Sequence, residues 1–272
     1  MFPIAAAGST RTILTNVMTI TNGATPLRYS GYRIETLRTR EGFDMEINIQ
    51  LTDRVGDIVM NYPRTAEVFK EYRIDFCCGG NKALLQVIRD QAIEGEALLQ
   101  SLSNAAVSPA AEAINWNERS SSQLIDYIVR THHGYVRSEL PPLNEYVKKV
   151  ARVHGSHHPE LIQVQQWFEA LRREMEHHME KEEREAFPAV IAYEKDPTEE
   201  KKERLSAVLN TLEREHEGSG HLLKQIRGVT HDYKLPDDAC TTFRLTYLKL
   251  EALEADMFQH IHLENNILFQ RA

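Results

Sequence analysis

The chain has 272 residues, of which 42% are hydrophobic and 26% charged, and its formal net charge at pH 7 is −8. This composition is typical of a globular protein with one large or two medium domains. The acidic balance argues against a nucleic-acid partner or an anionic membrane partner, because both require a basic excess.

The N-terminal segment, residues 1–44, has an unusual composition. Residues 1–34 contain no acidic residue and include Arg11, Arg28 and Arg33, which loosely resembles a transit peptide. The apolar run at 2–7 is too short for the core of a secretory signal, and no run approaches the roughly 18 apolar residues of a transmembrane helix. We interpret 1–44 as a disordered extension, or as an upstream start with the true beginning at Met45.

Apolar residues with helical spacing begin near Leu51 and predict a small helical domain at 45–103. Two helical runs are separated there by Cys77-Cys78-Gly79-Gly80. Residues 104–118 are rich in alanine, serine and asparagine and are predicted to be a linker. Only three cysteines occur in the chain, too few for a disulfide framework, which favours a reducing, cytoplasmic environment.

Residues 119–272 contain four long amphipathic stretches whose apolar positions alternate in steps of three and four. This spacing predicts four helices packed at shallow angles, and we expect an all-α four-helix bundle. Helix breaks are predicted at Pro159, at 196–198 and at 235–237, and Pro141-Pro142 is expected to interrupt the first helix.

Histidine is the residue that marks this segment, because all twelve lie between His132 and His262. His178 and Glu182 are four residues apart on one apolar seam, His260 and Glu264 repeat that pattern on another, and a third seam contains His216. Burying such groups costs several kcal/mol per charge unless something compensates them. A metal centre removes this cost, and imidazole with carboxylate favours iron, manganese or zinc.

Two positions stay open at this level. Both His132 and His133 border the seam of the first helix, so periodicity does not choose between them. His154 lies about 31 Å beyond His133 along a straight helix, so both can bind one centre only if the chain bends back at Pro141-Pro142.

A competing pattern is that of ferritin-like carboxylate sites. Glu174-x-x-His177 and Glu213-x-x-His216 match its Glu-x-x-His signature, which keeps an iron-oxidising enzyme among the alternatives. His177 is expected to face solvent, because adjacent helical residues point about 100° apart and the seam selects His178. The remaining histidines are predicted to be surface residues or to lie around the centre: His157, His158, His221, His231 and His262.

From near Leu51 to its end, the chain resembles the iron–sulfur cluster repair di-iron proteins (the RIC family), which contain a hemerythrin-like bundle. In the small domain the resemblance rests on the run from Phe69 to Gly80 that ends in Cys-Cys-Gly-Gly. In the bundle it rests on the runs 131–141, 153–155, 178–188, 215–216 and 260–269. Departures are the residues before Met45 and Gln270, where the family often has proline.

The resemblance implies two non-haem iron ions in an oxo- and carboxylate-bridged di-iron centre. The implied ligands are His133, His154, His178, Glu182, His216, His260 and Glu264. The implied function is repair of iron–sulfur clusters damaged by oxidative or nitrosative stress, which we expect to proceed by iron donation to damaged iron–sulfur proteins. Whether the chain also turns over a substrate, and whether it forms a homodimer, stays open.

Cys77 and Cys78 are the predicted catalytic residues, as a thiol pair of lowered pKa that contacts iron or the damaged protein. The alternative is that they are small buried residues at a helix start. A second class of function for the same centre is binding, sensing or reduction of dioxygen or nitric oxide, although a simple gas carrier has no use for the cysteine domain.

Overall fold

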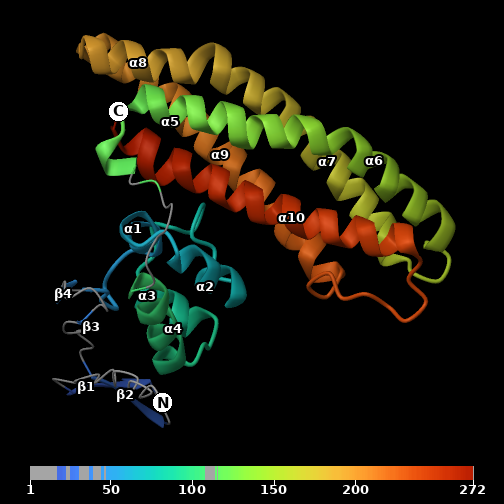
Figure 1. The fold of residues 1–272 in the computed structure, drawn as a ribbon, viewed down its shortest axis with the longest axis horizontal. Helices are drawn as coiled ribbons and strands as arrows, with labels where there is room; N and C mark the ends of the chain where they lie inside the picture. The colour runs from blue at the N-terminus through green and yellow to red at the C-terminus, as the bar shows by residue number, and fades with distance from the viewer. Residues whose placement is uncertain are drawn as a thin grey trace, which may run out of the picture. The chain divides into compact units, whose positions relative to one another are not determined.

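The computed structural model describes residues 17–22, 25–30, 37–38, 44–45, 47–107, 114 and 116–271. The chain divides into two compact units, Met1–Ile114 and Asn115–Ala272, and both contain packed helices (Figure 1). The predicted all-α fold, a four-helix bundle preceded by a small helical domain, is confirmed. Among the described helices, none has the length and hydropathy needed to cross a lipid bilayer.

Four short strands lie in the segment that was expected to be a disordered extension, much of which is outside the described residues. Strands β1 (Val17–Asn22) and β2 (Thr25–Ser30) pair antiparallel, as do β3 (Leu37–Arg38) and β4 (Asp44–Met45). No strand was predicted here. Valine, isoleucine and threonine in β1 favour extended backbone, and this preference was missed because the strands are short.

The small unit is built from four short helices around a compact apolar core. Its helices are α1 (Val55–Asn61), α2 (Thr65–Glu71), α3 (Leu84–Asp90) and α4 (Gly95–Val107), and α4 continues into the segment predicted as a linker. The loop between α2 and α3 contains the Cys-Cys-Gly-Gly run. Its neighbours Ile74 and Phe76 are fully buried, and the Phe76 ring packs on Phe69 of α2 with ring centroids 6.4 Å apart.

The larger unit is a bundle of four long helical rods (Figure 1). After a short 3-10 turn, η1 (Trp116–Glu118), the first rod joins α5 (Ser121–Tyr127), η2 (Ile128–His133) and α6 (Gly134–His154). The second rod joins α7 (Glu160–Lys181), η3 (Glu182–Ala186) and α8 (Phe187–Lys195). The third rod is α9 (Glu199–Val229), and the fourth joins α10 (Thr241–Leu263), η4 (Glu264–Leu268) and the 3-10 turn η5 (Phe269–Arg271).

The ends of the rods agree with the predicted helix breaks, but the first rod does not stop where expected. Ser120 and Gln123 form a reciprocal capping box at the start of α5, and the Thr198 hydroxyl accepts a hydrogen bond from the Lys201 amide at the start of α9. Helix α6, however, runs without interruption through Pro141 and Pro142. The predicted break there is wrong, because the packing of a long apolar seam outweighs the hydrogen bonds that the two prolines remove.

Three rods contain a π-helical segment, and each segment lies at a predicted ligand. Segment η2 ends at His133, η3 begins at Glu182, and η4 begins at Glu264. A π-helical turn accommodates one residue more than an α-helical turn, and such turns occur frequently at functional sites. The extra residue changes which side chains face the bundle core on either side of it.

Candidate metal centre

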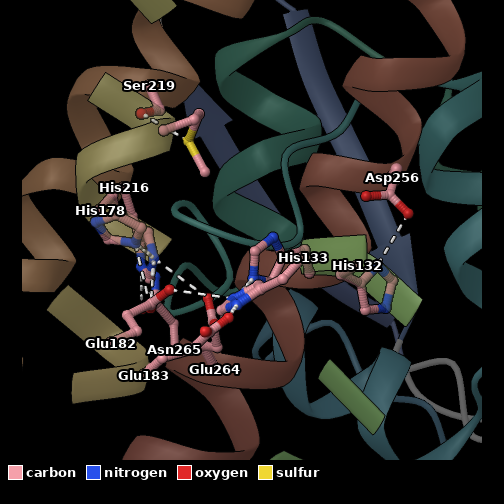
Figure 2. A network of polar contacts seen from close by, with 12 residues as sticks. His132, His133, His178, Glu182, Glu183, His216, Ser219, Asp256, Glu264 and Asn265 are labelled. Atoms are coloured by element: carbon pink, nitrogen blue, oxygen red, sulfur yellow. Dashed lines mark hydrogen bonds and ion pairs between the residues drawn. The ribbon is translucent and has the colours of Figure 1, made fainter. Parts of the chain in front are cut away.

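Two groups of possible metal ligands meet in the core of the bundle and share two glutamates. One group contains His133 and His260, the other contains His178 and His216, and both include Glu182 and Glu264. All six side chains are almost completely buried, with exposed fractions of 0 to 3%. Figure 2 shows His133 on one side of the two carboxylates and His178 and His216 on the other.

The first group is compact. The Nε2 atoms of His133 and His260 are 3.1 Å apart. The His133 Nε2 atom lies 3.4 Å from Glu182 Oε2, and His260 Nε2 lies 2.9 Å from Glu264 Oε1. In both imidazoles it is therefore the Nε2 atom that faces the carboxylates of Glu182 and Glu264.

The second group repeats this arrangement with the other oxygens. The Nε2 atoms of His178 and His216 are 2.8 Å apart. His178 Nε2 lies 3.2 Å from Glu182 Oε1, and His216 Nε2 lies 3.3 Å from Glu264 Oε2. Each carboxylate thus offers one oxygen to each imidazole pair, which is the arrangement of a ligand that bridges two ions.

The donor set fits two metal ions of the transition series. Neighbouring nitrogens on one six-coordinate ion with bonds of about 2.1 Å are about 3.0 Å apart, close to both imidazole spacings. Both oxygens of Glu182 and the Oε2 atom of Glu264 are buried and accept no hydrogen bond from any described residue. A buried carboxylate without such partners costs several kcal/mol, and a bound cation removes that cost.

Polar residues around the cluster orient three of the four imidazoles through their Nδ1 atoms. His133 Nδ1 lies 2.6 Å from Glu183, His178 Nδ1 lies 2.7 Å from Glu215, and His216 Nδ1 lies 2.8 Å from the Asn265 side-chain oxygen. Such bonds fix the ring orientation and leave Nε2 to the metal. Glu183, Glu215 and Asn265 were not predicted from the sequence, although each is the immediate neighbour of a clustered residue in the chain.

The charges of the cluster compensate one another when no ion is bound. Burial alone lowers the pKa of His133, but the nearby carboxylates of Glu182 and Glu264 outweigh burial and raise the pKa to about 10. Burial alone raises the pKa of Glu182, but the surrounding imidazoles hold that pKa well below its ordinary value. For His260 burial prevails and lowers the pKa, so this imidazole is neutral and can accept a hydrogen bond from protonated His133.

His132 is buried beside the cluster but does not belong to it. Its Nδ1 atom lies 2.9 Å from Asp256 Oδ1, and its ring stacks on His260 at a centroid distance of 5.4 Å. His132 and His133 are consecutive and both buried, and both lie in the π-helical segment η2. Of the two histidines that periodicity did not separate, only His133 reaches the shared glutamates.

His154 is not brought to the centre, so the implied ligand set is corrected by one residue. It is the last residue of α6, and its Nε2 atom lies 3.2 Å from the Cys240 sulfur. The bend that His154 needed at Pro141-Pro142 is absent, since α6 is continuous there.

The ferritin-like alternative is also not supported by the geometry. Glu174 and His177 are exposed and line a groove on the surface of the bundle, while the adjacent His178 points inward. His157, His221 and His231 are exposed, His158 is half-buried and pairs with Asp238, and His262 is buried beside Asn266.

Cys77 and Cys78 lie together in the loop between α2 and α3. Cys77 is buried and Cys78 half-buried, their sulfurs are 3.8 Å apart, and neither forms a disulfide. Burial, reinforced by Cys78 and the Asp75 carboxylate, raises the pKa of Cys77 well above its ordinary value. The predicted lowering of the thiol pKa is therefore wrong for Cys77, because burial and the neighbouring Asp75 carboxylate both disfavour the thiolate.

Two family models match the chain, and together they cover both helical regions. Residues 51–106 match ScdA_N, a domain of unknown function. Residues 124–272 match the hemerythrin HHE cation binding domain, which includes all six clustered residues.

Named relatives match over most of the chain. It is 36% identical over 217 residues to the iron-sulfur cluster repair protein ScdA of Staphylococcus haemolyticus, covering 80% of this chain and 96% of the relative. It is 32% identical over 218 residues to the iron-sulfur cluster repair protein YtfE of Dickeya chrysanthemi, covering 80% and 95%. For the YtfE of Escherichia coli O17:K52:H18, identity is 29% with the same coverage.

Proposed function

Because the chain belongs to the iron–sulfur cluster repair family, with its ScdA N-terminal and hemerythrin HHE domains, we propose that it repairs damaged iron–sulfur clusters by donating iron from a di-iron centre. The targets are iron–sulfur proteins of the cytoplasm. The damage is oxidative or nitrosative, because both kinds of stress remove or modify cluster iron.

The observation that carries this proposal is the sharing of Glu182 and Glu264 by two imidazole pairs. Glu182 and Glu264 would hold two ions, one with His133 and His260 and the other with His178 and His216. This mixed nitrogen and oxygen set suits iron and excludes calcium or magnesium as the preferred ion. When bound, the iron pair supplies redox chemistry and a store of transferable metal.

The residues of the chain make loss of an ion tolerable. Only two carboxylates would hold the ions, so the negative charge available to retain them is small. Without an ion, protonated imidazoles can serve as hydrogen-bond partners of Glu182 and Glu264. The outer partners Glu183 and Glu215 remain hydrogen-bonded to His133 and His178 and hold the emptied site in shape.

We assign the transfer step to Cys77 and Cys78. A thiol pair in a loop suits contact with iron in transit or with the damaged protein, because the ligands of iron–sulfur clusters are themselves thiolates. The centre in the bundle contains no sulfur ligand among the described residues, so the two parts of the chain offer chemically different positions for iron.

The test is reduction of the iron-loaded protein without oxygen, in the presence of a cluster-free acceptor protein. We expect iron to move to the acceptor and cluster absorption to return. Replacing both Cys77 and Cys78 by serine should leave the iron content of the bundle unchanged and slow the repair, whereas Cys240→Ser should change neither. If reduced wild-type protein transfers no iron, donation is the wrong mechanism.

Binding of dioxygen or nitric oxide at the same centre is the second candidate, and the groove beside His178 favours it. Its lining includes Glu215 and Gly218, and a Cβ atom added at Gly218 would meet nothing within 4 Å. A small molecule can therefore approach the outer side of His178. Gly218→Leu fills the groove, so slower nitric oxide binding with unchanged iron content would support binding of gas through this groove, and an unchanged rate of binding would contradict it.

A further inference from the structure

The loop between α2 and α3 contains a further group of possible metal ligands, which belongs to the small unit. Ligand atoms of Asp75, Cys77 and Cys78 all lie within 4.8 Å of one another. The Cys77 sulfur is 3.1 Å from Asp75 Oδ1 and 3.8 Å from the Cys78 sulfur. Two sulfurs and one carboxylate oxygen therefore converge on one small volume.

The loop is built to keep these three residues in place. Asp75 stands between Ile74 and Phe76, whose side chains are fully buried and anchor the backbone on both sides. The Cys77 amide donates a hydrogen bond to Asp75 Oδ1 at 3.0 Å. Further along, the Gly80 carbonyl accepts a hydrogen bond from the Gly56 amide at 2.8 Å, which ties the loop to α1.

Gly79 explains why glycine follows the cysteines. A Cβ atom at this position would lie 2.9 Å from the Asp75 carbonyl oxygen and 3.3 Å from the Asp75 Cγ atom. Any other residue would push the backbone away from Asp75 and open the group. The glycine therefore serves the close approach of Asp75 to the two cysteines.

The distance between the sulfurs fits a shared ion better than it fits a disulfide. A disulfide requires about 2.05 Å between the sulfurs, which this loop does not approach. Two thiolates bound to one tetrahedral ion at about 2.3 Å each are about 3.8 Å apart. The observed spacing equals that value.

We propose that Asp75, Cys77 and Cys78 bind one thiophilic divalent cation of the iron or zinc class, with a fourth position left open. The half-buried Cys78 gives the ion access from solvent, and the buried Cys77 supplies the inner ligand. Binding replaces the two thiol protons by the ion, so about two protons pass to solvent per cation bound and no electron is transferred.

The identity of the ion as ferrous iron in transit rests on the proposed function. An open fourth position allows a thiolate of an iron–sulfur protein to bind the same ion before the loop releases it. In that exchange one metal–sulfur bond forms for each that breaks. The site would then be a transfer position for iron, whereas the bundle is the store.

The test is titration of the iron-loaded full-length protein with Co²⁺ as the only added metal. The near-ultraviolet absorption spectrum is recorded after each addition. Cobalt bound to thiolate has an intense near-ultraviolet charge-transfer band, which cobalt bound only to imidazole and carboxylate lacks, so the readout is independent of the bundle. We expect one cobalt per chain to produce this band. Cys78→Ser should abolish it, Asp75→Asn should weaken binding by about tenfold or more, and Cys240→Ser should leave it unchanged.

Absence of the band in the folded wild-type protein, or its persistence when both Cys77 and Cys78 are replaced, would overturn the site. Helical circular dichroism of each variant reports whether the small unit is still folded, and Cys78→Ser is the milder change because Cys78 is only half-buried. Repair without cobalt binding would contradict this inference alone. Cobalt binding without repair would contradict the proposed function alone.

Discussion

The bundle cluster and the Asp75–Cys78 loop group differ in every property that controls a metal ion. The cluster consists of imidazoles and carboxylates that are buried among long helices, and its ring nitrogens are oriented by further polar residues. The loop group consists of two sulfurs and one carboxylate between short helices, and it is partly open to solvent. The chain therefore offers a metal ion two kinds of surroundings, an enclosed one with imidazole and carboxylate groups and an accessible one with two thiols and a carboxylate.

This difference indicates that the bundle cluster is suited to storage of an ion and the loop group to its exchange. Removing a ligand from a buried position leaves uncompensated charge in the core, so ion and protein stability are coupled there. An open loop position has solvent as a substitute ligand, so an ion can leave at lower cost. Substitutions can test this contrast, and those of Glu182 and Glu264, which both imidazole pairs share, should have the largest effects.

Loss of a shared carboxylate should have the largest effect. Glu264→Gln removes an oxygen ligand from both imidazole pairs, so we expect the purified protein to retain almost none of its two irons. Metal analysis and the visible absorption spectrum measure this. The matched control is Glu180→Gln, which changes an exposed glutamate on α7 that pairs with Arg184 and should not change iron content. Full retention of both irons in Glu264→Gln would rule out a bridging role.

A change of one imidazole should affect one ion more than the other. His178→Ala removes a ligand of the second pair only, and we expect iron content to fall by about half. His177→Ala is the matched control, since the adjacent histidine is exposed and should retain both irons. Equal loss in both variants would mean that the two residues act on iron through something other than direct binding.

Neutralising an outer partner should have an intermediate effect. Glu215 accepts a hydrogen bond from Lys181 at 2.6 Å and contacts His178 Nδ1, so Glu215→Gln keeps the shape and removes the charge. We expect iron affinity to fall by about 10- to 100-fold, measured by competition with a chelator. An unchanged iron affinity of Glu215→Gln would show that packing alone orients the His178 ring well enough for metal binding.

The smallest effect should be found at the pair of half-buried His158 and exposed Asp238, which also joins an imidazole to a carboxylate but lies outside the buried core. Their Nε2 and Oδ1 atoms are 3.0 Å apart. The hydrogen bond to Asp238 raises the pKa of His158, and His158 lowers the pKa of Asp238. The stabilisation from His158 is complete below about pH 6.5 and is lost as pH rises through the folded pKa of His158.

The stabilisation of the folded state by Asp238 depends on pH in the opposite direction. It is present above about pH 4 and is lost as pH falls through the folded pKa of Asp238. Asp238→Asn should therefore lower the melting temperature by only a degree or two, between about pH 4 and 6.5, and should not change iron content. A large shift, or one that persists at pH 9, would contradict this assignment.

The sequence was sufficient to predict which polar residues of the helical seams are buried together. His178, Glu182, His260 and Glu264 follow from spacing of four residues on apolar faces, and His216 follows from its place on a third seam. His133 came only from the resemblance, because periodicity treats it and His132 alike. Both histidines are buried in the structure, and the π-helical segment that contains them leaves no clear mark in the amino-acid pattern.

Two other features depend on tertiary packing that local rules do not include. The exclusion of His154 follows from the continuity of α6 through two prolines, against the intrinsic preference of proline. The orienting residues Glu183, Glu215 and Asn265 lie off the apolar seams, so a search for seam residues misses them. Adjacency to a ligand in the chain is the signal that could have found them.

The three π-helical segments have a consequence for how this centre is inherited. Each differs from an α-helical turn by a single inserted residue, which is one codon in the gene. Deleting one codon within η2, η3 or η4 turns the remainder of that rod by about 100° relative to the part before it. Such a deletion can abolish the centre while every ligand residue stays encoded, so the length of these helices is inherited information as much as the identity of the ligands.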